Sequence, residues 1–284
     1  MDSYEDRVNL LRSDSERFAQ YVSALPDEAW GRQSACDRWQ VADVVAHLVG
    51  VAEFYAGTVT RGIQGDTSAP EGRAPAGSAS AASSAEGIAL GALANRERLG
   101  AELLATFRAK DGHLNDVLAG VQPQDRDKPC YHPGGFVPAG NFVDMRFKEL
   151  ALHEWDIRSA LEPEAGLSPA SLPSMMHLIS NSLASGSLPW AFWPGPDLPA
   201  SARFRFDVTG PVQLKADVAV EGDKVRLEGS GEAPADVSFR CDTETFVLLM
   251  YGRLAPASAI KKGRLEAAGG SELTEQFSQW FKGI

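Results

Sequence analysis

The sequence has few cysteines and no excess of basic residues. Its 284 residues include three cysteines, Cys36, Cys130 and Cys241, which are widely spaced and form no CxxC pair. This excludes a disulfide framework and indicates reduced thiols. The chain has 27 basic and 38 acidic residues, a formal net charge of −11. Nucleic-acid binding through neutralisation of phosphates is therefore disfavoured.

Long apolar runs are also lacking. No stretch reaches the roughly 18 apolar residues that a membrane-spanning helix needs. The first residues, MDSYEDRVNLL, contain neither the basic nor the apolar segment of a secretory signal. We therefore expect a cytoplasmic protein with small-molecule partners and no membrane or nucleic-acid partner. The sequence does not define its oligomeric state.

The first part of the chain has the apolar periodicity of helices, with steps of three and four residues. Predicted helices cover residues 3–24, 40–61, 86–110 and 141–161. Pro163 ends the last of them. The segment 62–85 is almost wholly Gly, Ala, Ser, Pro and Thr, which predicts a mobile loop or lid. Four long helices predict an antiparallel bundle, whose sites are formed by inward side chains of facing helices.

The last third of the chain changes to a period of two. Apolar and polar residues alternate, with Gly-rich turns between segments, over 203–208, 212–220, 224–228 and 237–240. This pattern is typical of an antiparallel sheet with one covered face. Helices predicted near 243–251 and 272–281 supply the cover. With a further helix near 170–185 assigned to the first part, we expect a four-helix bundle over 1–188 and a smaller α+β domain over 195–284.

Two ionisable residues share one face of the last bundle helix. Glu149 and His153 are four residues apart, so a helix places their Cβ atoms about 6 Å from each other. This helix is apolar nearly all round, and a buried carboxylate is normally paired or metal-bound. His47 is the one polar residue on the inner stripe of the second helix. Together these residues make the two-histidine, one-glutamate set of many catalytic zinc sites.

A purely structural role for the same residues stays open at this point. A Glu and a His four residues apart often form a plain hydrogen bond, and an inward histidine is usually a satisfied core residue. His113, His132 and His177 lie in turn-like segments or on a short helix and are typical of surface or packing positions. Asp156 and Arg158 indicate an ion pair at a helix end, or Asp156 supports a ligand histidine from behind.

Two stretches carry a resemblance to a known family. Residues 34–48, SACDRWQVADVVAHL, and 146–158, RFKELALHEWDIR, are similar to the signature stretches of the mycothiol-dependent maleylpyruvate isomerase family. This family is a branch of the DinB-like metal-binding four-helix bundles. The resemblance implies that His47, Glu149 and His153 bind a divalent metal, usually zinc. It also implies that the thiol of mycothiol, or the substrate, approaches the open coordination position.

A second, looser resemblance lies near the C-terminus. Residues 246–256, FVLLMYGRLAP, with the closing residues 277–284, are similar to the sterol-carrier-protein-like domain that follows the bundle in this family. Such domains often offer an apolar cavity. The resemblance implies that Arg253, after Gly252, pairs with a substrate carboxylate. The alternative is a helix-ending glycine followed by a solvated arginine.

The resemblance implies an enzyme that uses a metal and a low-molecular-weight thiol. We expect a mycothiol-dependent isomerase or S-transferase that acts on a small electrophilic or anionic substrate, with the metal lowering the pKa of the thiol. One alternative is a hydrolase or lyase that uses metal-bound water and no thiol. Another is a carrier or sensor of an apolar ligand. The loops 62–85 and 131–140 depart from the family pattern, which leaves the substrate open.

Overall fold

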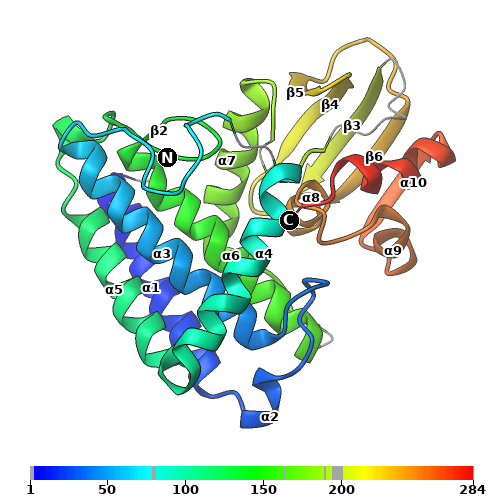
Figure 1. The fold of residues 1–284 in the computed structure, drawn as a ribbon. Helices are drawn as coiled ribbons and strands as arrows, with labels where there is room; N and C mark the ends of the chain where they lie inside the picture. Colours follow the sequence, from blue (N-terminus) through cyan, green and yellow to red (C-terminus); the bar gives the residue numbers. More distant parts are fainter. Residues whose placement is uncertain (1–2, 79–80, 163, 189, 194–200, 284) are drawn as a thin grey trace. The chain divides into compact units, whose positions relative to one another are not determined.

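The chain folds into two compact units, Met1–Ser171 and Leu172–Ile284. The first unit is helical and the second combines helices with a sheet, which confirms the predicted fold class (Figure 1). The computed structural model describes residues 3–78, 81–162, 164–188, 190–193 and 201–283.

Four helices form the bundle of the first unit. They are α1 (Tyr4–Ser23), α3 (Val41–Ile63), α5 (Leu103–Ala119) and α6 (Phe142–Leu161). Both α1 and α3 contact α5 and α6, so the four helices close around one core, with the short α2 (Asp27–Trp30) between α1 and α3 along the chain. Fully buried side chains in this core include Leu11, Phe18, Leu48, Phe107 and Phe147.

Polar residues fix where two of these helices begin. The Ser3 hydroxyl accepts the N–H of Asp6, and the Asp6 carboxylate accepts the N–H of Ser3, a capping box for α1. At the start of α3, the Asp43 carboxylate accepts the N–H of Gln40 at 2.8 Å. Because the start of α3 is fixed in this way, the rotation that turns His47 toward α6 is fixed as well.

The region predicted as one helix over 86–110 is two helices. α4 (Ala81–Leu99) is followed by a 3-10 turn, Gly100–Glu102, and then by α5. Gly100 has a φ of 49°, in the left-handed region that favours glycine, and this interrupts the helix. Residues 81–85, predicted as loop, are helical because alanine is the best helix former. The predicted loop 62–85 is shorter by these residues.

The described part of that loop is hydrogen-bonded to another segment. The Tyr131 hydroxyl donates to the Ala74 carbonyl oxygen at 2.7 Å. The N–H of Gly77 donates to the Pro133 carbonyl oxygen at 3.0 Å. These bonds join the loop to residues 131–133. Mobility of the loop and a lid function stay predictions.

Residues 129–138 form a small hairpin against α3. Its strands β1 (Pro129–Cys130) and β2 (Val137–Pro138) pair antiparallel. Cys130 packs on α3 at Gly62, where a Cβ atom would overlap its sulfur. The Thr58 hydroxyl donates to the Tyr131 carbonyl oxygen at 2.7 Å. The hairpin is thus held on the helix that carries His47.

Among the described residues, α3 is the helix whose length and hydropathy would suit a membrane span. In the structure, 61% of its apolar window is buried inside the chain. The core helix of a bundle has the same composition, so its apolar character is accounted for by packing.

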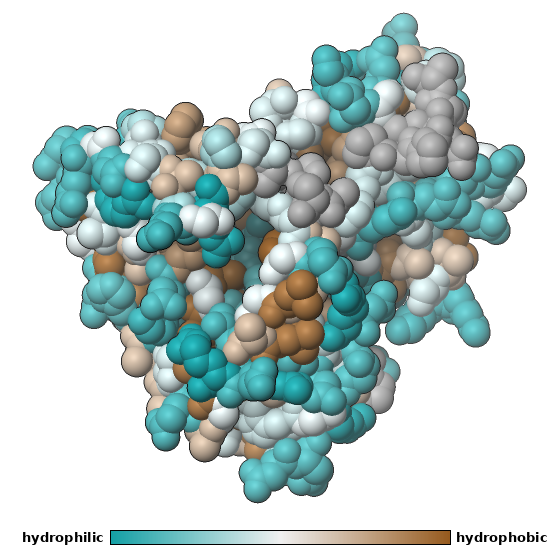
Figure 2. All heavy atoms as spheres, viewed as in Figure 1, coloured by the Kyte–Doolittle hydropathy of each residue, from teal (hydrophilic) through white to brown (hydrophobic). Residues whose placement is uncertain are grey.

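Hydrophilic side chains cover most of the face seen in Figure 2, in agreement with the net charge of −11. The large apolar side chains exposed in the described parts of the chain are Leu10, Leu90, Leu93, Phe136 and Ile260. Leu90 and Leu93 share α4, and the others lie on separate segments. Scattered exposed apolar residues of this kind are normal for a folded chain.

A five-stranded sheet in the order β5-β4-β3-β6-β7 forms the second unit. The strands are β3 (Ala202–Thr209), β4 (Leu214–Glu221), β5 (Lys224–Gly229), β6 (Val237–Asp242) and β7 (Leu265–Gly269). The first four were predicted, and β7 was not. β6 pairs with β3 in parallel, with Phe206 opposite Phe239, so the prediction of a wholly antiparallel sheet is wrong here. The reason is that the chain leaves the edge strand β5 and crosses to the other side of β3.

Aromatic side chains fill the covered face of this sheet. The helices of the unit are α7 (Leu172–Ala184), α8 (Thr243–Met250), α9 (Pro256–Lys261) and α10 (Ser271–Trp280). The Phe204 and Phe277 rings are 5.1 Å apart between centroids, Phe206 and Phe246 4.9 Å, and Phe239 and Phe277 5.7 Å. α8 and α10 therefore pack on the sheet through interlocked rings.

The first unit ends at Ser171, whereas the sequence predicted that it ends at residue 188. The difference is the helix α7. α7 contacts α8 and β5, so it groups with the second unit. Pro163, predicted to end a helix, and residues 189 and 194–200, near the predicted boundary, lie outside the described residues.

Candidate functional site

The bundle brings three predicted site residues together. Nε2 of His47, on α3, lies 3.3 Å from Oε2 of Glu149, on α6. Nε2 of His153, one turn further along α6, lies 3.6 Å from the same oxygen. The exposed fractions of the His47, Glu149 and His153 side chains are 13%, 14% and 7%. The group is enclosed by the bundle and still reachable from solvent.

Trp39 packs against both imidazole rings. Its ring centroid is 4.9 Å from that of His47 and 5.9 Å from that of His153. The Ser34 hydroxyl donates to the Trp39 carbonyl oxygen at 2.7 Å, which stabilises the turn directly before α3. Trp39 thus covers one side of both candidate histidine ligands.

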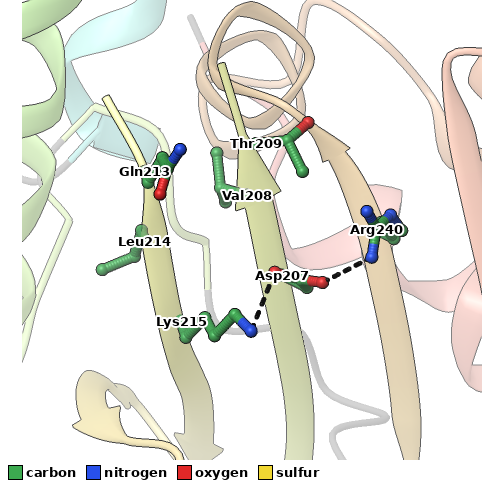
Figure 3. A pocket seen from close by; sticks show the side chains of 7 residues that line it. All are labelled: Asp207, Val208, Thr209, Gln213, Leu214, Lys215 and Arg240. Carbon is green, nitrogen blue, oxygen red and sulfur yellow. Dashed lines mark hydrogen bonds and ion pairs between the residues drawn. The ribbon is translucent and has the colours of Figure 1, made fainter. Parts of the chain in front are cut away.

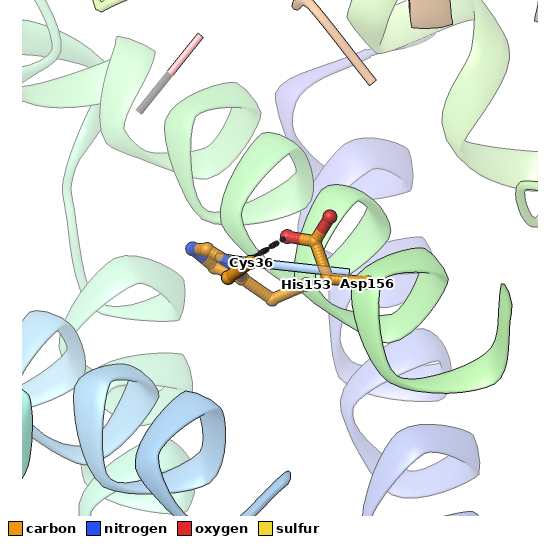
Figure 4. A group of neighbouring side chains, drawn as sticks. All are labelled: Cys36, His153 and Asp156. Atoms are coloured by element: carbon orange, nitrogen blue, oxygen red, sulfur yellow. Dashed lines mark hydrogen bonds and ion pairs between the residues drawn. The ribbon is translucent and has the colours of Figure 1, made fainter. Parts of the chain in front are cut away.

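The other ring nitrogen of His153 faces a second group. Nδ1 lies 2.9 Å from Oδ2 of Asp156, and the Cys36 sulfur lies 3.2 Å from the same oxygen (Figure 4). The N–H of Ala35 donates to the Asp156 carbonyl oxygen at 2.8 Å and holds this segment on α6. Because a carboxylate only accepts, Nδ1 of His153 carries a hydrogen, and in the neutral ring Nε2 offers its lone pair toward Glu149.

Burial and neighbouring charges set the ionisation of the group. Burial lowers the pKa of His47, although the hydrogen bond with Glu149 raises it. Burial alone would lower the pKa of His153, but Asp156, Cys36 and Glu149 raise it well above its ordinary value. Burial alone would raise the pKa of Glu149, but Lys148 and the two histidines hold it well below its ordinary value. Glu149 is therefore an anion at neutral pH, and an ion at Nε2 of His153 would replace a proton.

Among the described residues of the bundle, two sets of ligand atoms lie close enough to share an ion. His47, Glu149 and His153 form one set, and Cys36, His153 and Asp156 the other, with atoms within 4.8 Å of one another in each. In the second set the Asp156 carboxylate is 1% exposed and already bonded to both partners. The first set has two imidazole nitrogens, a carboxylate and access from solvent, which fits a divalent ion such as zinc. It is the better candidate metal centre.

Asp156→Asn is expected to weaken metal binding about 10- to 100-fold while the fold is retained. An asparagine amide can donate toward Nδ1 of His153, which favours the ring form with its hydrogen on Nε2. That hydrogen blocks the lone pair that a metal needs. Competition with a chromophoric chelator measures the zinc affinity.

Asp116→Asn, on the exposed side of α5, is the matched control, since this carboxylate is 79% exposed. Equal zinc affinities for Asp156→Asn and wild type would show that Asp156 does not orient His153.

Several predicted residues lie outside the group. His113 is exposed on α5. His177 on α7 has its Nε2 2.9 Å from Nδ2 of Asn181. Arg158 pairs with Glu154 at 3.0 Å and with Glu162 at 3.2 Å. The predicted partner, Asp156, lies 2.9 Å from Nδ1 of His153, which is the alternative that the sequence left open.

Arg253 belongs to the second unit and follows α8. Gly252 before it has a φ of 67°, which supports the alternative of a helix-ending glycine. The Arg253 guanidinium donates to the Tyr251 carbonyl oxygen at 3.1 Å. Its pairing with a substrate carboxylate stays a prediction.

Three further residues interact with the group or are affected by its charges, and the sequence assigned none of them to the site. Nζ of Lys148 lies 3.5 Å from Oε1 of Glu149, and its side chain is 12% exposed. Burial, and then the charge of Glu149, raises the pKa of Tyr55 well above its ordinary value. Burial, and then the charge of Lys148, lowers the pKa of His132 to about 4. Of these residues, only Lys148 could have been found from the sequence, because it is next to Glu149. The position of His132 depends on how its hairpin packs.

A shallow pocket of about 350 Å³ lies on the exposed face of the sheet (Figure 3). Its lining residues are Asp207, Val208, Thr209, Gln213, Leu214, Lys215 and Arg240. Asp207 pairs with Arg240 at 2.9 Å and with Lys215 at 3.9 Å. The charged groups of the pocket thus pair with one another, and the bundle group is the stronger candidate for chemistry.

Comparisons with known proteins match both units of the chain. The family model for the mycothiol maleylpyruvate isomerase N-terminal domain matches residues 11–158, and the model for the SCP-2 sterol transfer family matches residues 199–282. A crystal structure of the mycothiol-dependent maleylpyruvate isomerase is similar over 89% of this chain and 90% of that chain, with 15% identity and a TM-score of 0.60. A histidine-to-alanine mutant of a mycothiol-dependent maleylpyruvate isomerase is similar over 94% and 93%, with 14% identity and a TM-score of 0.63. None of the curated proteins compared matches the chain.

Proposed function

The chain belongs to the mycothiol maleylpyruvate isomerase N-terminal domain family, and on this premise we propose that it is an enzyme that uses a divalent metal and a low-molecular-weight thiol. Zinc is the proposed metal and mycothiol the proposed thiol. The proposed reaction is isomerisation of, or thiol transfer to, a small electrophilic or anionic substrate. The observation that carries the proposal is the convergence of His47, Glu149 and His153 on facing helices.

The side chains around this point are suited to hold such a centre. Glu149 supplies a carboxylate that is charged at neutral pH. Asp156 orients the His153 ring so that Nε2 faces Glu149. Trp39 packs on both imidazoles and excludes water from that side. A divalent ion held there would lower the pKa of a thiol bound to it.

In an isomerisation the thiolate is a transient nucleophile. Its sulfur forms a bond to one carbon of an activated cis double bond, and the π electron pair moves onto the conjugated carbonyl group. Rotation about the resulting single bond follows. The pair then returns, the C–S bond breaks and the thiolate leaves, so no atom is gained and nothing is oxidised. In an S-transfer the C–S bond would remain.

A carrier role for the second unit has less support. The space between its sheet and the helices α8 and α10 is occupied by interlocked phenylalanine rings. These rings give the unit a packed core of its own. We therefore place the proposed chemistry in the bundle.

The cobalt-substituted protein tests the proposal. Thiolate is a softer ligand than water, so adding mycothiol is expected to produce an intense sulfur-to-cobalt charge-transfer band. Turnover of cis-dicarboxylate or electrophilic substrates by the zinc protein is expected to require the thiol. The two measurements together report thiol binding and thiol use.

Full turnover in the strict absence of thiol would instead establish a hydrolase or lyase. A protein that turns over none of these substrates and binds apolar ligands equally well after His47→Ala would be a carrier. His113→Ala is the control, since His113 is exposed and far along the chain from both motifs.

A further inference from the structure

A cysteine, a histidine and an aspartate meet on the Nδ1 side of the His153 ring (Figure 4). We propose that Cys36, His153 and Asp156 form a second metal site, which takes thiophilic ions such as Cd²⁺ and competes with the first set for His153. The competition rests on the proposed function, and the binding of the thiophilic ion does not.

One carboxylate oxygen connects the ligand atoms of this second set. Oδ2 of Asp156 lies 3.2 Å from the Cys36 sulfur and 2.9 Å from Nδ1 of His153, and the three atoms lie within 4.8 Å of one another. In tetrahedral coordination, atoms that are about 2.0–2.3 Å from an ion lie about 3.3–3.8 Å apart. Small shifts of these side chains would therefore convert the hydrogen-bonded group into a ligand set.

The turn that carries Cys36 is fixed on α6 by its backbone. The N–H of Ala35 donates to the Asp156 carbonyl oxygen at 2.8 Å. The N–H of Cys36 donates to the Ser34 hydroxyl at 3.1 Å, and its carbonyl oxygen accepts the N–H of Trp39 at 3.0 Å. Because these bonds hold the sulfur beside the carboxylate, little ordering is needed when an ion binds.

Cys36 differs from the other two cysteines in its access to ligands. Its side chain is of intermediate exposure, whereas Cys130 and Cys241 are buried. Burial raises the pKa of Cys130 to about 11 and that of Cys241 to about 12, so both remain protonated thiols at neutral pH. Thiophilic ions select thiolate ligands. Cys36 is therefore the cysteine suited to bind such an ion, and the first set offers it no sulfur.

The two sets share one imidazole, and this makes them exclusive. A neutral imidazole has one ring hydrogen and one lone pair. An ion that binds Nδ1 of His153 leaves the ring hydrogen on Nε2, and the Cys36 thiol gives its proton to water. The hydrogen on Nε2 faces Glu149 and occupies the position that an ion in the first set needs. A thiophilic ion in the second set would thus displace zinc from the first.

Cadmium titration of the purified full chain, followed by ultraviolet absorption, tests the second site. A sulfur-to-cadmium charge-transfer band is expected to grow until about one ion per chain is bound. Cys36→Ser is expected to abolish this band, because a hydroxyl group is a harder ligand and contains no sulfur. Cys241→Ser is the matched control and is expected to keep the band, since Cys241 is buried in the second unit.

His47→Ala separates the two sets. This variant removes a ligand from the first set and none from the second, so it is expected to keep the cadmium band. Loss of the band in His47→Ala would overturn the inference, because Cys36 would then belong to the first set. A band of full intensity in Cys36→Ser, or no band in wild type, would overturn it as well.

Elemental analysis of the zinc-loaded protein, after addition of cadmium and desalting, tests the competition. Wild type is expected to lose zinc in proportion to the cadmium that it binds, and Cys36→Ser is expected to retain most of its zinc. A cadmium band with all zinc retained would overturn the competition. A protein that shows the band and never binds zinc would refute the proposed function and leave the second site intact. Bound zinc without a cadmium band would do the reverse.

Discussion

Replacing His153 with alanine is expected to remove the metal from the protein and, with it, all thiol-dependent turnover. His153 provides one of the two imidazole nitrogens near Glu149, and His47 provides the other. No third histidine among the described residues lies in that group. Loss of a ligand costs more than the about 10- to 100-fold expected for loss of a supporting residue. Elemental analysis of protein purified without chelator is expected to give about one divalent ion per chain for wild type and almost none for the variant.

The fold is expected to survive this change, because the bundle core consists of many fully buried apolar side chains. Far-UV circular dichroism measures this directly. His113→Ala, on the exposed side of α5, is the control and should keep its metal. Negligible metal in wild type and variant alike would refute the metal centre and every enzymatic role proposed for it.

Of the substitutions described here, Asp111→Ala is expected to lower the free energy of unfolding most. Asp111 accepts two hydrogen bonds from the guanidinium of Arg146, at 2.7 Å and 3.1 Å, and Arg146 is fully buried. An arginine cannot lose its proton to escape burial, so the variant holds an unpaired charge in the core. Removing one partner of a buried pair costs about 3–5 kcal/mol. Urea unfolding followed by far-UV circular dichroism measures the change.

The double variant Asp111→Leu/Arg146→Leu is expected to recover most of this loss, because both charges are then absent. Asp116→Ala is the surface control. Its pair with Arg12 is exposed, and such pairs contribute less than about 1 kcal/mol. If Asp111→Ala were as mild as Asp116→Ala, water would have to reach Arg146 in the core.

The sequence was sufficient for the candidate ligands and insufficient for their surroundings. Glu149 and His153 could be paired from their spacing, because an α-helix places residues four apart on one face. His47 followed from its place on an apolar stripe. His132 could not be placed, since its position depends on how a hairpin packs at Gly62, far away in the sequence. Contacts of this kind have no local periodicity.

For the fold as well, the sequence predicted features with a local pattern and missed those without one. Helices and strands with strong apolar patterns were predicted close to their observed bounds. The break at Gly100 was not predicted, because the apolar residues before and after it continue a helical pattern. β7 was also missed, since residues 265–269 show no alternation between apolar and polar side chains. The parallel pairing of β6 with β3 depends on a crossover that no local pattern encodes.

Both ring nitrogens of His153 face carboxylates, and this would restrict the movement of protons in the proposed reaction. Nδ1 is bonded to Asp156 and Nε2 faces Glu149. A histidine in this position has no nitrogen with which to take a proton from an incoming thiol and return it later. In the proposed reaction, the thiol proton would therefore leave by a route other than the His153 ring. In such an enzyme, a solvent isotope effect on turnover would not originate at the His153 imidazole.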